Sequence, residues 1–234
     1  MPDTLLEDVR SLLGEIPLDF GGGCSVFKAY LMAWLIRKHG VTESVDIGVY
    51  RGRSLFPQAL AHRATGGRVY GVDPWEAGEV MEHDNAELRE QIRRFVETTD
   101  FGAIYRSVDD FRVSHGLADH CVLVRKTSQE AAEEFRGRGA SFGLIHVDGN
   151  HDTRLVVQDV QLYLPLLREG GFMVLDDASW GSVQPALRLL EQSAQPLFAL
   201  TDREKANDFA VFWKGGSRMD ALGLRLALRR LPRA

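Results

Sequence analysis

Short apolar runs alternate with helical segments through most of this chain, from Ser44 to Glu191. Runs of four or five apolar residues suit strands, and strands that alternate with helices are typical of β-α units, which assemble a parallel sheet. The predicted strands are Val45–Val49, Val69–Val72, Cys121–Val124, Leu144–Val147 and Phe172–Leu175. The predicted helices that follow them are Leu55–Arg63, Glu87–Val96, Gln129–Phe135, Arg154–Leu167 and Val183–Glu191. This alternation predicts an α/β fold with a doubly wound, mostly parallel sheet.

Two further apolar runs, Leu197–Thr201 and Phe209–Trp213, are joined only by the polar loop Asp202–Asp208. Parallel strands need a crossover of a dozen or more residues, whereas a loop this short joins antiparallel strands. We therefore expect a C-terminal antiparallel hairpin at the edge of the sheet, which brings the sheet to seven strands.

Helical patterns flank the sheet region on both sides. Two amphipathic helices are predicted before it, over Thr4–Leu13 and Ser25–Lys38, and glycine or proline follows each of them. After it, residues 218–234 combine five arginines with regularly spaced leucines, which favours a terminal helix packed on the body or on a second subunit over a membrane-surface helix. We expect one domain overall, with an N-terminal helical segment (1–40), a sheet region (41–215) and a basic amphipathic tail (216–234).

Composition narrows the choice of partner and compartment. The net charge of −5 argues against a nucleic-acid partner, since binding to nucleic acid depends on neutralising phosphates with Lys and Arg. No segment has the roughly 20 apolar residues of a membrane span, and the N-terminus lacks the pattern of a signal peptide. Two cysteines without metal-binding spacing suit a reducing compartment. We expect a cytoplasmic protein with a small-molecule partner, and self-association into a dimer or higher oligomer.

The first predicted strand runs into a glycine-containing turn, Asp46 to Ser54, which leads directly to a helix. Glycines at Gly48 and Gly52 let a backbone approach a ligand closely, and the helix N-terminus offers free N–H groups. The spacing is G-x-x-x-G, whereas a dinucleotide site prefers G-x-G-x-x-G. Asp46 can accept hydrogen bonds from a cationic amino-acid group or from a bound water, and it would repel a pyrophosphate.

A second acid stands at the end of the second predicted strand, where Asp73 follows Val72. It lies about 20 residues past Gly52, and a carboxylate in this position characteristically holds the hydroxyl pair of a ribose. The glycine turn and Asp73 together therefore predict a site for a nucleoside-containing ligand.

The fourth and fifth predicted strands also end in acids, Asp148 after Val147 and the pair Asp176 and Asp177 after Leu175. Neighbouring parallel strands deliver their carboxyl ends to one rim, so we expect these three side chains to converge. Three carboxylates in one crevice repel each other unless a cation or protons compensate them. Oxygen donors favour Mg²⁺ or a similar hard cation, although His146 and His151 leave a softer metal open.

These motifs together closely resemble the class I S-adenosylmethionine (SAM)-dependent methyltransferases, which have a Rossmann-like seven-stranded sheet with an antiparallel strand. By this resemblance, residues 41–215 form the SAM-binding domain. Asp46, Gly48, Gly52 and Ser54 would surround the methionine part of SAM, Asp73 would hold the ribose, and Ser128 would touch the adenine or its ribose.

The run His-Val-Asp-Gly-Asn-His at residues 146–151, followed by a helix, a strand and Asp-Asp, narrows the resemblance. It is similar to the metal-dependent O-methyltransferases typified by macrocin O-methyltransferase, and to the cephalosporin hydroxylase group. The likeness spans Val41 to Leu190. It implies methyl transfer from SAM to a hydroxyl group of a sugar or natural product, with Mg²⁺ held by Asp148, Asp176 and Asp177.

One position departs from this pattern, because Asn150 stands where the related proteins commonly have a second acid. An amide cannot serve as a general base, so either the proton acceptor is another residue or the metal does more of the activation. The expected catalytic residues are Asn150 and His151, with His151 as the candidate base. The ordinary pKa of histidine, near neutrality, suits that role. The alternative for His151 is a capping or packing role, which histidines at strand-to-helix turns often have. His146 points inward on the strand and is expected to be structural.

The long connection Glu76–Asp119, together with Trp75 just before it, is predicted to form a substrate lid, with a surface excursion as the alternative. Its apolar and aromatic candidates are Trp75, Met81, His83 and Phe101. Two rival functions remain open. One is a non-methylating member of the same fold, of the cephalosporin hydroxylase type, and the other is a nucleotide-binding or scaffold module.

Overall fold

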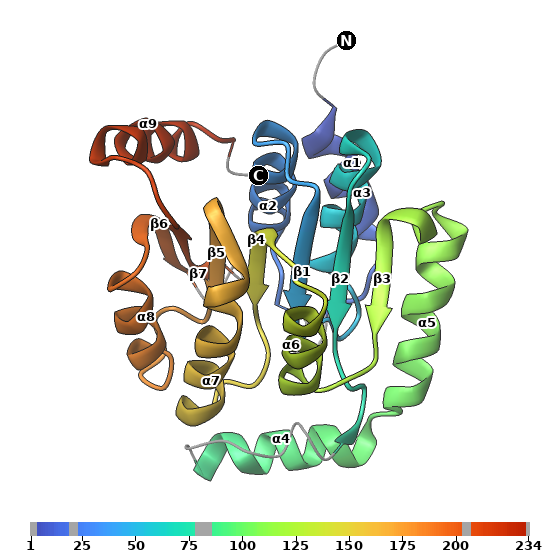
Figure 1. Ribbon diagram of the computed structural model, residues 1–234. Helices are drawn as coiled ribbons and strands as arrows, with labels where there is room; N and C mark the ends of the chain where they lie inside the picture. The colour runs from blue at the N-terminus through green and yellow to red at the C-terminus, as the bar shows by residue number, and fades with distance from the viewer. Residues whose placement is uncertain (1–3, 19–22, 78–85, 203–206, 233–234) are drawn as a thin grey trace.

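The computed structural model describes residues 4–18, 23–77, 86–202 and 207–232. These residues form a seven-stranded sheet in the order β3-β2-β1-β4-β5-β7-β6 (Figure 1). The strands are β1 (Glu43–Ile47), β2 (Arg68–Val72), β3 (Cys121–Val124), β4 (Phe142–Val147), β5 (Leu167–Asp176), β6 (Gln195–Asp202) and β7 (Asn207–Trp213). Strands β1 to β5 are parallel, and β7 runs antiparallel to both β5 and β6. This topology confirms the predicted doubly wound sheet with a C-terminal antiparallel hairpin.

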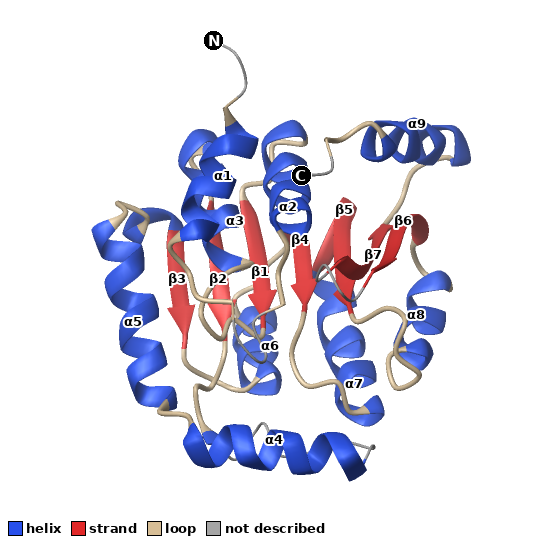
Figure 2. Cartoon of the chain, turned by 180° about the vertical axis from the view of Figure 1, so that it is seen from behind, coloured by secondary structure: helices blue, strands red, loops and turns tan. Residues whose placement is uncertain are grey.

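Helices cover both faces of the sheet and give three layers (Figure 2). Residues of α1 (Leu5–Gly14), α2 (Val26–Lys38), α3 (Leu55–Thr65), α5 (Phe101–Ser114) and α9 (Arg218–Arg229) share one buried apolar cluster with one face of the sheet. Residues of α6 (Ser128–Gly137), α7 (Thr153–Tyr163) and α8 (Gln184–Glu191) share a second cluster with the other face. Because both faces are buried, strand residues of either orientation are apolar, which explains the continuous apolar runs in the sequence.

The predicted helix Arg154–Leu167 is too long. Helix α7 ends at Tyr163, a 3₁₀ turn η3 covers Leu164–Leu166, and β5 already begins at Leu167. Pro165 lies in this turn; proline lacks an N–H group and disfavours helical backbone in the residue before it. The predicted strand Phe172–Leu175 is therefore only the second half of β5.

Other element boundaries differ by a few residues. Helix α1 continues through Gly14, where the sequence predicts a stop. In the hairpin, Asp202 and Asp208 belong to β6 and β7 rather than to the predicted loop, and residues 203–206 lie outside the described part of the chain.

The connection between β2 and β3 holds two long helices where one was predicted. Helix α4 (Ala86–Thr98) crosses below the carboxyl ends of the parallel strands, and α5 then runs beside β3 (Figure 1). A short 3₁₀ turn, η2 (Ala118–His120), leads into β3. Met81 and His83 of the predicted lid lie outside the described residues.

The predicted terminal helix is present as α9. Ala221 and Leu228 are buried in the apolar cluster of the α1–α3 face, whereas Met219, Leu222 and Leu226 are exposed by 75, 47 and 47%. Among the residues that the structure describes, no helix is long and apolar enough to span a membrane.

Candidate active site

Unusual backbone conformations gather at the carboxyl edge of the sheet. Tyr50, Trp75 and Asp177 have positive φ angles of 48°, 47° and 48°, and they follow β1, β2 and β5 by at most three residues. A non-glycine residue in this region costs on the order of 1–3 kcal/mol, and such residues cluster at functional sites. The candidate site therefore lies where the three strands end.

The two predicted glycines are required by contacts within the protein. Gly48 has a φ of 85°, and a Cβ atom there would lie 1.9 Å from the backbone oxygen of Asp148. Gly52 also has a φ of 85°, and its Cβ atom would lie 2.4 Å from the ring of Phe56. Gly48 thus lets the turn after β1 meet the turn after β4. An approach of this turn to a ligand remains a prediction.

Asp73 ties together the two loops that border the edge. One carboxylate oxygen accepts a hydrogen bond from the N–H of Tyr50 at 2.9 Å, and the other accepts from the N–H of Trp75 at 2.6 Å. Burial raises the pKa of Asp73 despite these N–H groups, which lower it. Each carboxylate oxygen has a second lone pair, so Asp73 keeps capacity to accept from a ribose diol.

Asp46 and Ser54 point beneath the turn, into the protein. The carboxylate of Asp46 is fully buried and accepts from the Ser54 hydroxyl at 2.7 Å. Its other oxygen lies 2.5 Å from Nδ1 of His146, the residue that pairs with Asp46 across β1 and β4. Both predicted methionine-binding side chains are thus engaged within the protein, where they hold the turn from below.

Lys28 on α2 is a site residue that the sequence reasoning missed. Its side chain is buried, its ammonium contacts the carboxylate of Asp176, and it lies 3.7 Å from Oδ2 of Asp148. Burial lowers the pKa of Lys28, but the charges of Asp176, Cys24 and Asp148 and a hydrogen bond to Asp176 together raise it. The sequence feature that could have revealed Lys28 is its position as the third residue of a helix that is otherwise apolar on nearly all sides.

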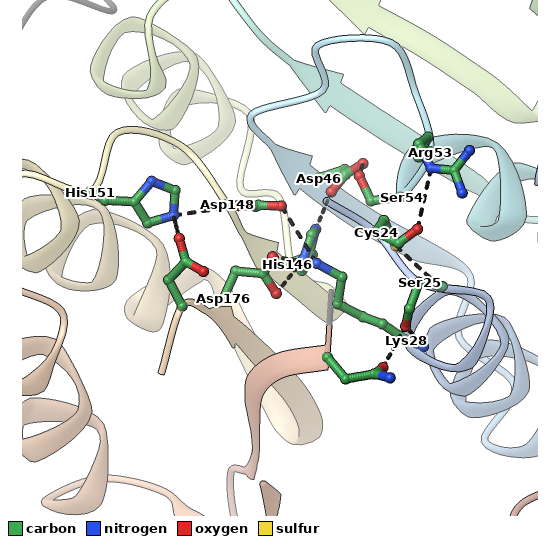
Figure 3. A network of polar contacts seen from close by, with 12 residues as sticks. Cys24, Ser25, Lys28, Asp46, Arg53, Ser54, His146, Asp148, His151 and Asp176 are labelled. Atoms are coloured by element: carbon green, nitrogen blue, oxygen red, sulfur yellow. Dashed lines mark hydrogen bonds and ion pairs between the residues drawn. The ribbon is translucent and has the colours of Figure 1, made fainter. Parts of the chain in front are cut away.

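His146 links the ends of this buried network. Its Nδ1 contacts Asp46, and its Nε2 lies 3.7 Å from Oδ1 of Asp176. Burial lowers the pKa of His146, but the neighbouring carboxylates, above all Asp46, raise it to about 10. Figure 3 shows the resulting chain of contacts from Ser54 through Asp46, His146 and Asp176 to Lys28. His146 is inward and buried, as predicted.

His151 stands on the more open side of the network. Its Nε2 lies 3.1 Å from Asp177 and 3.5 Å from Asp148, and its ring centroid lies 5.5 Å from that of Trp180. Burial lowers the pKa of His151, but the contacts with Asp148 and Asp177 raise it to about 9. For the carboxyl group of Asp177 burial acts in the opposite direction and raises the pKa to about 7. His151 is therefore mainly an imidazolium at neutral pH.

The neighbouring predicted residue, Asn150, has a local structural contact. Its amide oxygen accepts a hydrogen bond from the N–H of Asp152, and Asp152 caps α7 by accepting from Arg154. This places Asn150 in the turn that carries His151.

Ser128 begins α6, where its hydroxyl donates to Asp159 of α7 at 2.5 Å. Burial raises the pKa of Asp159 to about 6. Contact of Ser128 with an adenine or ribose remains a prediction.

The predicted convergence of acids is found for Asp148 and Asp176. Together with His146 they offer three ligand atoms that lie within 4.8 Å of one another. Asp177, the third predicted ligand, is not in that group and contacts His151 instead.

A metal ion does not fit this group while Lys28 keeps its position. A divalent cation bound between Asp148 and Asp176 would lie near the ammonium, and at 4 Å the two cations would repel by about 8 kcal/mol at an effective dielectric constant of 20.

A cavity of about 510 Å³ opens between the turn after β1 and the two helices of the long connection. Tyr50 and Arg51 line it from the turn, and Phe95 and Ile104 line it from α4 and α5. Its volume is in the range of small-molecule sites.

Comparisons with known proteins agree with this architecture. Tricin synthase 1 from Oryza sativa subsp. japonica is 31% identical over 156 residues, which cover 67% of this chain and 53% of that protein. The chain thus matches about half the length of this relative.

The fold is shared with solved structures, among them two methyltransferases. The O-methyltransferase TomG from Streptomyces achromogenes, solved in complex with SAM and involved in tomaymycin synthesis, superposes with a TM-score of 0.60 at 15% identity over 92% of both chains. The methyltransferase PaMTH1 from Podospora anserina, bound to SAH, superposes with a TM-score of 0.58 at 16% identity over 92% of this chain and 89% of that one.

A family model described as a methyltransferase domain matches residues 45–178, which is more than half of the chain. The matched segment runs from β1 past the end of β5 and contains the glycine turn, Asp73 and the acids at the ends of β4 and β5. The chain therefore belongs to the methyltransferase domain family.

Proposed function

We propose that this protein is a SAM-dependent O-methyltransferase that acts on a hydroxyl group of a small molecule of the sugar or natural-product type. The observation that carries the proposal is the pairing of two features at one edge of the sheet. Asp73 borders the glycine turn after β1, and the cluster of Asp148, His151 and Asp177 lies at the ends of β4 and β5. The names of the relatives, tricin synthase 1 and the O-methyltransferase TomG, support this choice of reaction.

The donor side of the proposed site is the turn after β1 together with Asp73. Bound SAM supplies a methyl group on a positively charged sulfur, which makes that group reactive without a covalent enzyme intermediate. Asp73 accepts hydrogen bonds from the ribose hydroxyls through its remaining lone pairs, and Ser128 touches the adenine end. Asp46 and Ser54 keep Gly48 and Gly52 in place from below.

The acceptor side is the surface around His151. The imidazole takes the proton of the acceptor hydroxyl, and Asp148 and Asp177 stabilise the imidazolium that forms. The acceptor oxygen then forms a bond to the methyl carbon while the carbon–sulfur bond breaks and its electron pair stays on sulfur. Alignment of the reactants contributes most of the rate, up to about 7–11 kcal/mol of the barrier. Asn150 holds the turn that positions His151.

The expected Mg²⁺ requirement is a separate question from methyl transfer. Asp148, Asp176 and Asp177 are oxygen donors of the type that Mg²⁺ prefers. Lys28 and His151 already compensate their charge in this structure, and the mechanism above uses no metal.

Three further features belong to the proposal. The helices α4 and α5 form a lid over the site, and the cavity beside Tyr50 receives part of the acceptor. The exposed apolar side chains of α9 join two copies of the chain. We place the protein in the cytoplasm, because Cys24 and Cys121 are free thiols, as a reducing compartment favours. Burial raises the pKa of each thiol to about 12, which keeps both protonated.

The test combines ligand binding with methyl transfer. Calorimetry with SAM, SAH and NAD should show binding of the first two and none of NAD, and labelled SAM should then transfer its methyl group to members of a panel of small hydroxyl compounds. SAM binding without transfer to any member of the panel would favour the non-methylating alternative. Binding of NAD in preference to SAM would favour a nucleotide-binding module and contradict the proposal.

A further inference from the structure

The lysine at position 28 contacts the same two acids that a metal ion would need. Its Nζ atom contacts Asp176 and lies 3.7 Å from Oδ2 of Asp148. Lys28 reaches them from α2, 148 positions away from Asp176 in the sequence. The relative exposure of its side chain is 1%. The acidic cluster of β4 and β5 thus receives a cation from another part of the fold.

The backbone of Lys28 is anchored at the start of α2, which fixes the point from which its side chain reaches the acids. Its N–H donates to the hydroxyl of Ser25, the N-cap of α2, at 3.0 Å, and that hydroxyl in turn contacts Asn207 of β7 at 2.5 Å. The preceding residue, Phe27, packs against Phe198 and Phe209 of the hairpin, with ring centroids 5.9 and 6.3 Å away. These contacts fix the start of α2 on the sheet.

Positively charged and carboxylate side chains meet around Lys28. Its ammonium contacts Asp176 and lies 3.7 Å from Oδ2 of Asp148, and Nε2 of His151 lies 3.5 Å from Oδ1 of Asp148. Both carboxylates therefore have the ammonium of Lys28 beside them. A divalent ion would add two positive charges to a pair of carboxylates that already have an ammonium beside them.

We propose that Lys28 is the resident cation of this site and takes the place of a divalent metal, so that its ammonium holds Asp148 and Asp176 in position and excludes Mg²⁺. One consequence of this proposal, that methyl transfer needs no added metal, rests on the proposed function. The exclusion of metal itself concerns the protein without donor or acceptor, and it can be tested there.

The test is a titration of the full chain with Mn²⁺, used as a paramagnetic probe for the Mg²⁺ site and followed by electron paramagnetic resonance of the free ion. Wild type should take up no stoichiometric Mn²⁺. The variant Lys28→Met removes the charge, and its affinity should rise at least about tenfold, equal to ~1.4 kcal/mol. The matched control is Lys126→Met, which removes an exposed lysine that pairs with Glu134 outside the cluster and should behave like wild type.

Thermal melting gives a second reading, since an ion that binds only the folded state raises the melting midpoint. Mn²⁺ should raise the midpoint of Lys28→Met and leave that of wild type unchanged. If Lys28→Met does not fold, the wild-type titration decides alone, because absence of a site supports the proposal and a stoichiometric site overturns it.

Two results overturn the proposal. One is stoichiometric Mn²⁺ binding by wild type that is lost in Asp148→Asn, and the other is a folded Lys28→Met variant that gains no affinity for Mn²⁺. Calorimetry with SAM in EDTA separates this question from the proposed function. Failure to bind SAM would contradict the methyltransferase assignment and leave the metal result intact.

Discussion

At the scale of single residues, His151 determines the pH dependence of the proposed reaction. Its contacts with Asp177 at 3.1 Å and Asp148 at 3.5 Å favour the imidazolium and raise its pKa to about 9. A raised pKa means that the proton stays bound until the pH approaches that value. At neutral pH only about 1% of the imidazole is therefore available as a base.

The rate of methyl transfer should consequently rise with pH up to about 9, since only neutral His151 can accept the proton of the acceptor. Replacing His151 by Gln should lower the rate by roughly 10²–10⁴ and remove this pH limb. The measurement is rate against pH at saturating SAM, with His115→Gln, a histidine on the far end of α5, as the control. An identical limb in wild type and His151→Gln would show that another group takes the proton.

The residues of the site were predictable to different degrees. Asp148 and Asp176 follow apolar runs directly, and parallel strands bring their carboxyl ends to one rim, so the convergence of these two acids was predictable from the sequence. The same reasoning places Asp73 at the end of β2. The inward orientation of Asp46 does not, because both faces of β1 are buried and no alternation of polar and apolar residues marks a side. Lys28 was missed because its partners come from β4 and β5, which only the folded chain brings to α2.

At the scale of elements, the connection from β2 to β3 shapes the proposed site. The ring of Phe95 on α4 lies 5.7 Å from that of Tyr50 in the turn after β1, and 5.9 Å from that of Phe101 at the start of α5. Trp75, just after β2, packs on Tyr105 of α5 at 5.0 Å. These aromatic contacts attach both helices to the edge of the sheet.

Replacing Phe95 by Ala should loosen α4 and impair acceptor binding more than donor binding. An aromatic pair contributes about 0.5–1.5 kcal/mol beyond its buried area, so the acceptor KM should rise by roughly 2- to 12-fold while the Kd for SAM changes little. Steady-state kinetics and calorimetry measure the two constants. The control is Val113→Ala, an exposed position on α5. An unchanged acceptor KM would argue against α4 as a lid.

Helix α5 has a clear helical pattern in the sequence but was not predicted. Phe101, Ile104 and Val108 are its buried residues, spaced by three and four positions, and Asp100 caps its first turn. Only one helix, Glu87–Val96, was predicted in this connection, and the rest was interpreted as part of a substrate lid or a surface excursion, so the pattern was not recognised as a second helix. The misplaced end of α7 has a different cause, since the apolar pattern continues through Leu164–Leu166 although Pro165 interrupts the backbone hydrogen bonds.

At the scale of the whole molecule, the order of β-α units predicts the fold well. The five parallel strands and the closing hairpin follow from apolar runs and loop lengths alone, because each β-α-β crossover leaves few topologies open. Association between molecules has no comparable local signature. It is inferred here from the apolar side chains that α9 leaves exposed.

A dimer through α9 should be present at tens of micromolar and should depend on Leu222 and Leu226, which are both 47% exposed. Replacing both by Glu would place charges in the contact and should give a monomer with an unchanged melting midpoint. Light scattering measures the mass, with Arg229→Glu as a control for charge alone. A wild-type protein that is already monomeric would remove the proposed contact.

The central claim, that SAM binds at the carboxyl edge of the sheet, is tested most directly by calorimetry with SAM on wild type, Asp73→Ala and the exposed control Asp119→Ala. Wild type and Asp119→Ala should bind one SAM per chain with equal affinity. Asp73→Ala should lose about 1–3 kcal/mol, which raises the Kd by roughly 5- to 150-fold, because the hydrogen bonds to the ribose are lost. No binding by the folded wild type, or an unchanged Kd in Asp73→Ala, would contradict the account.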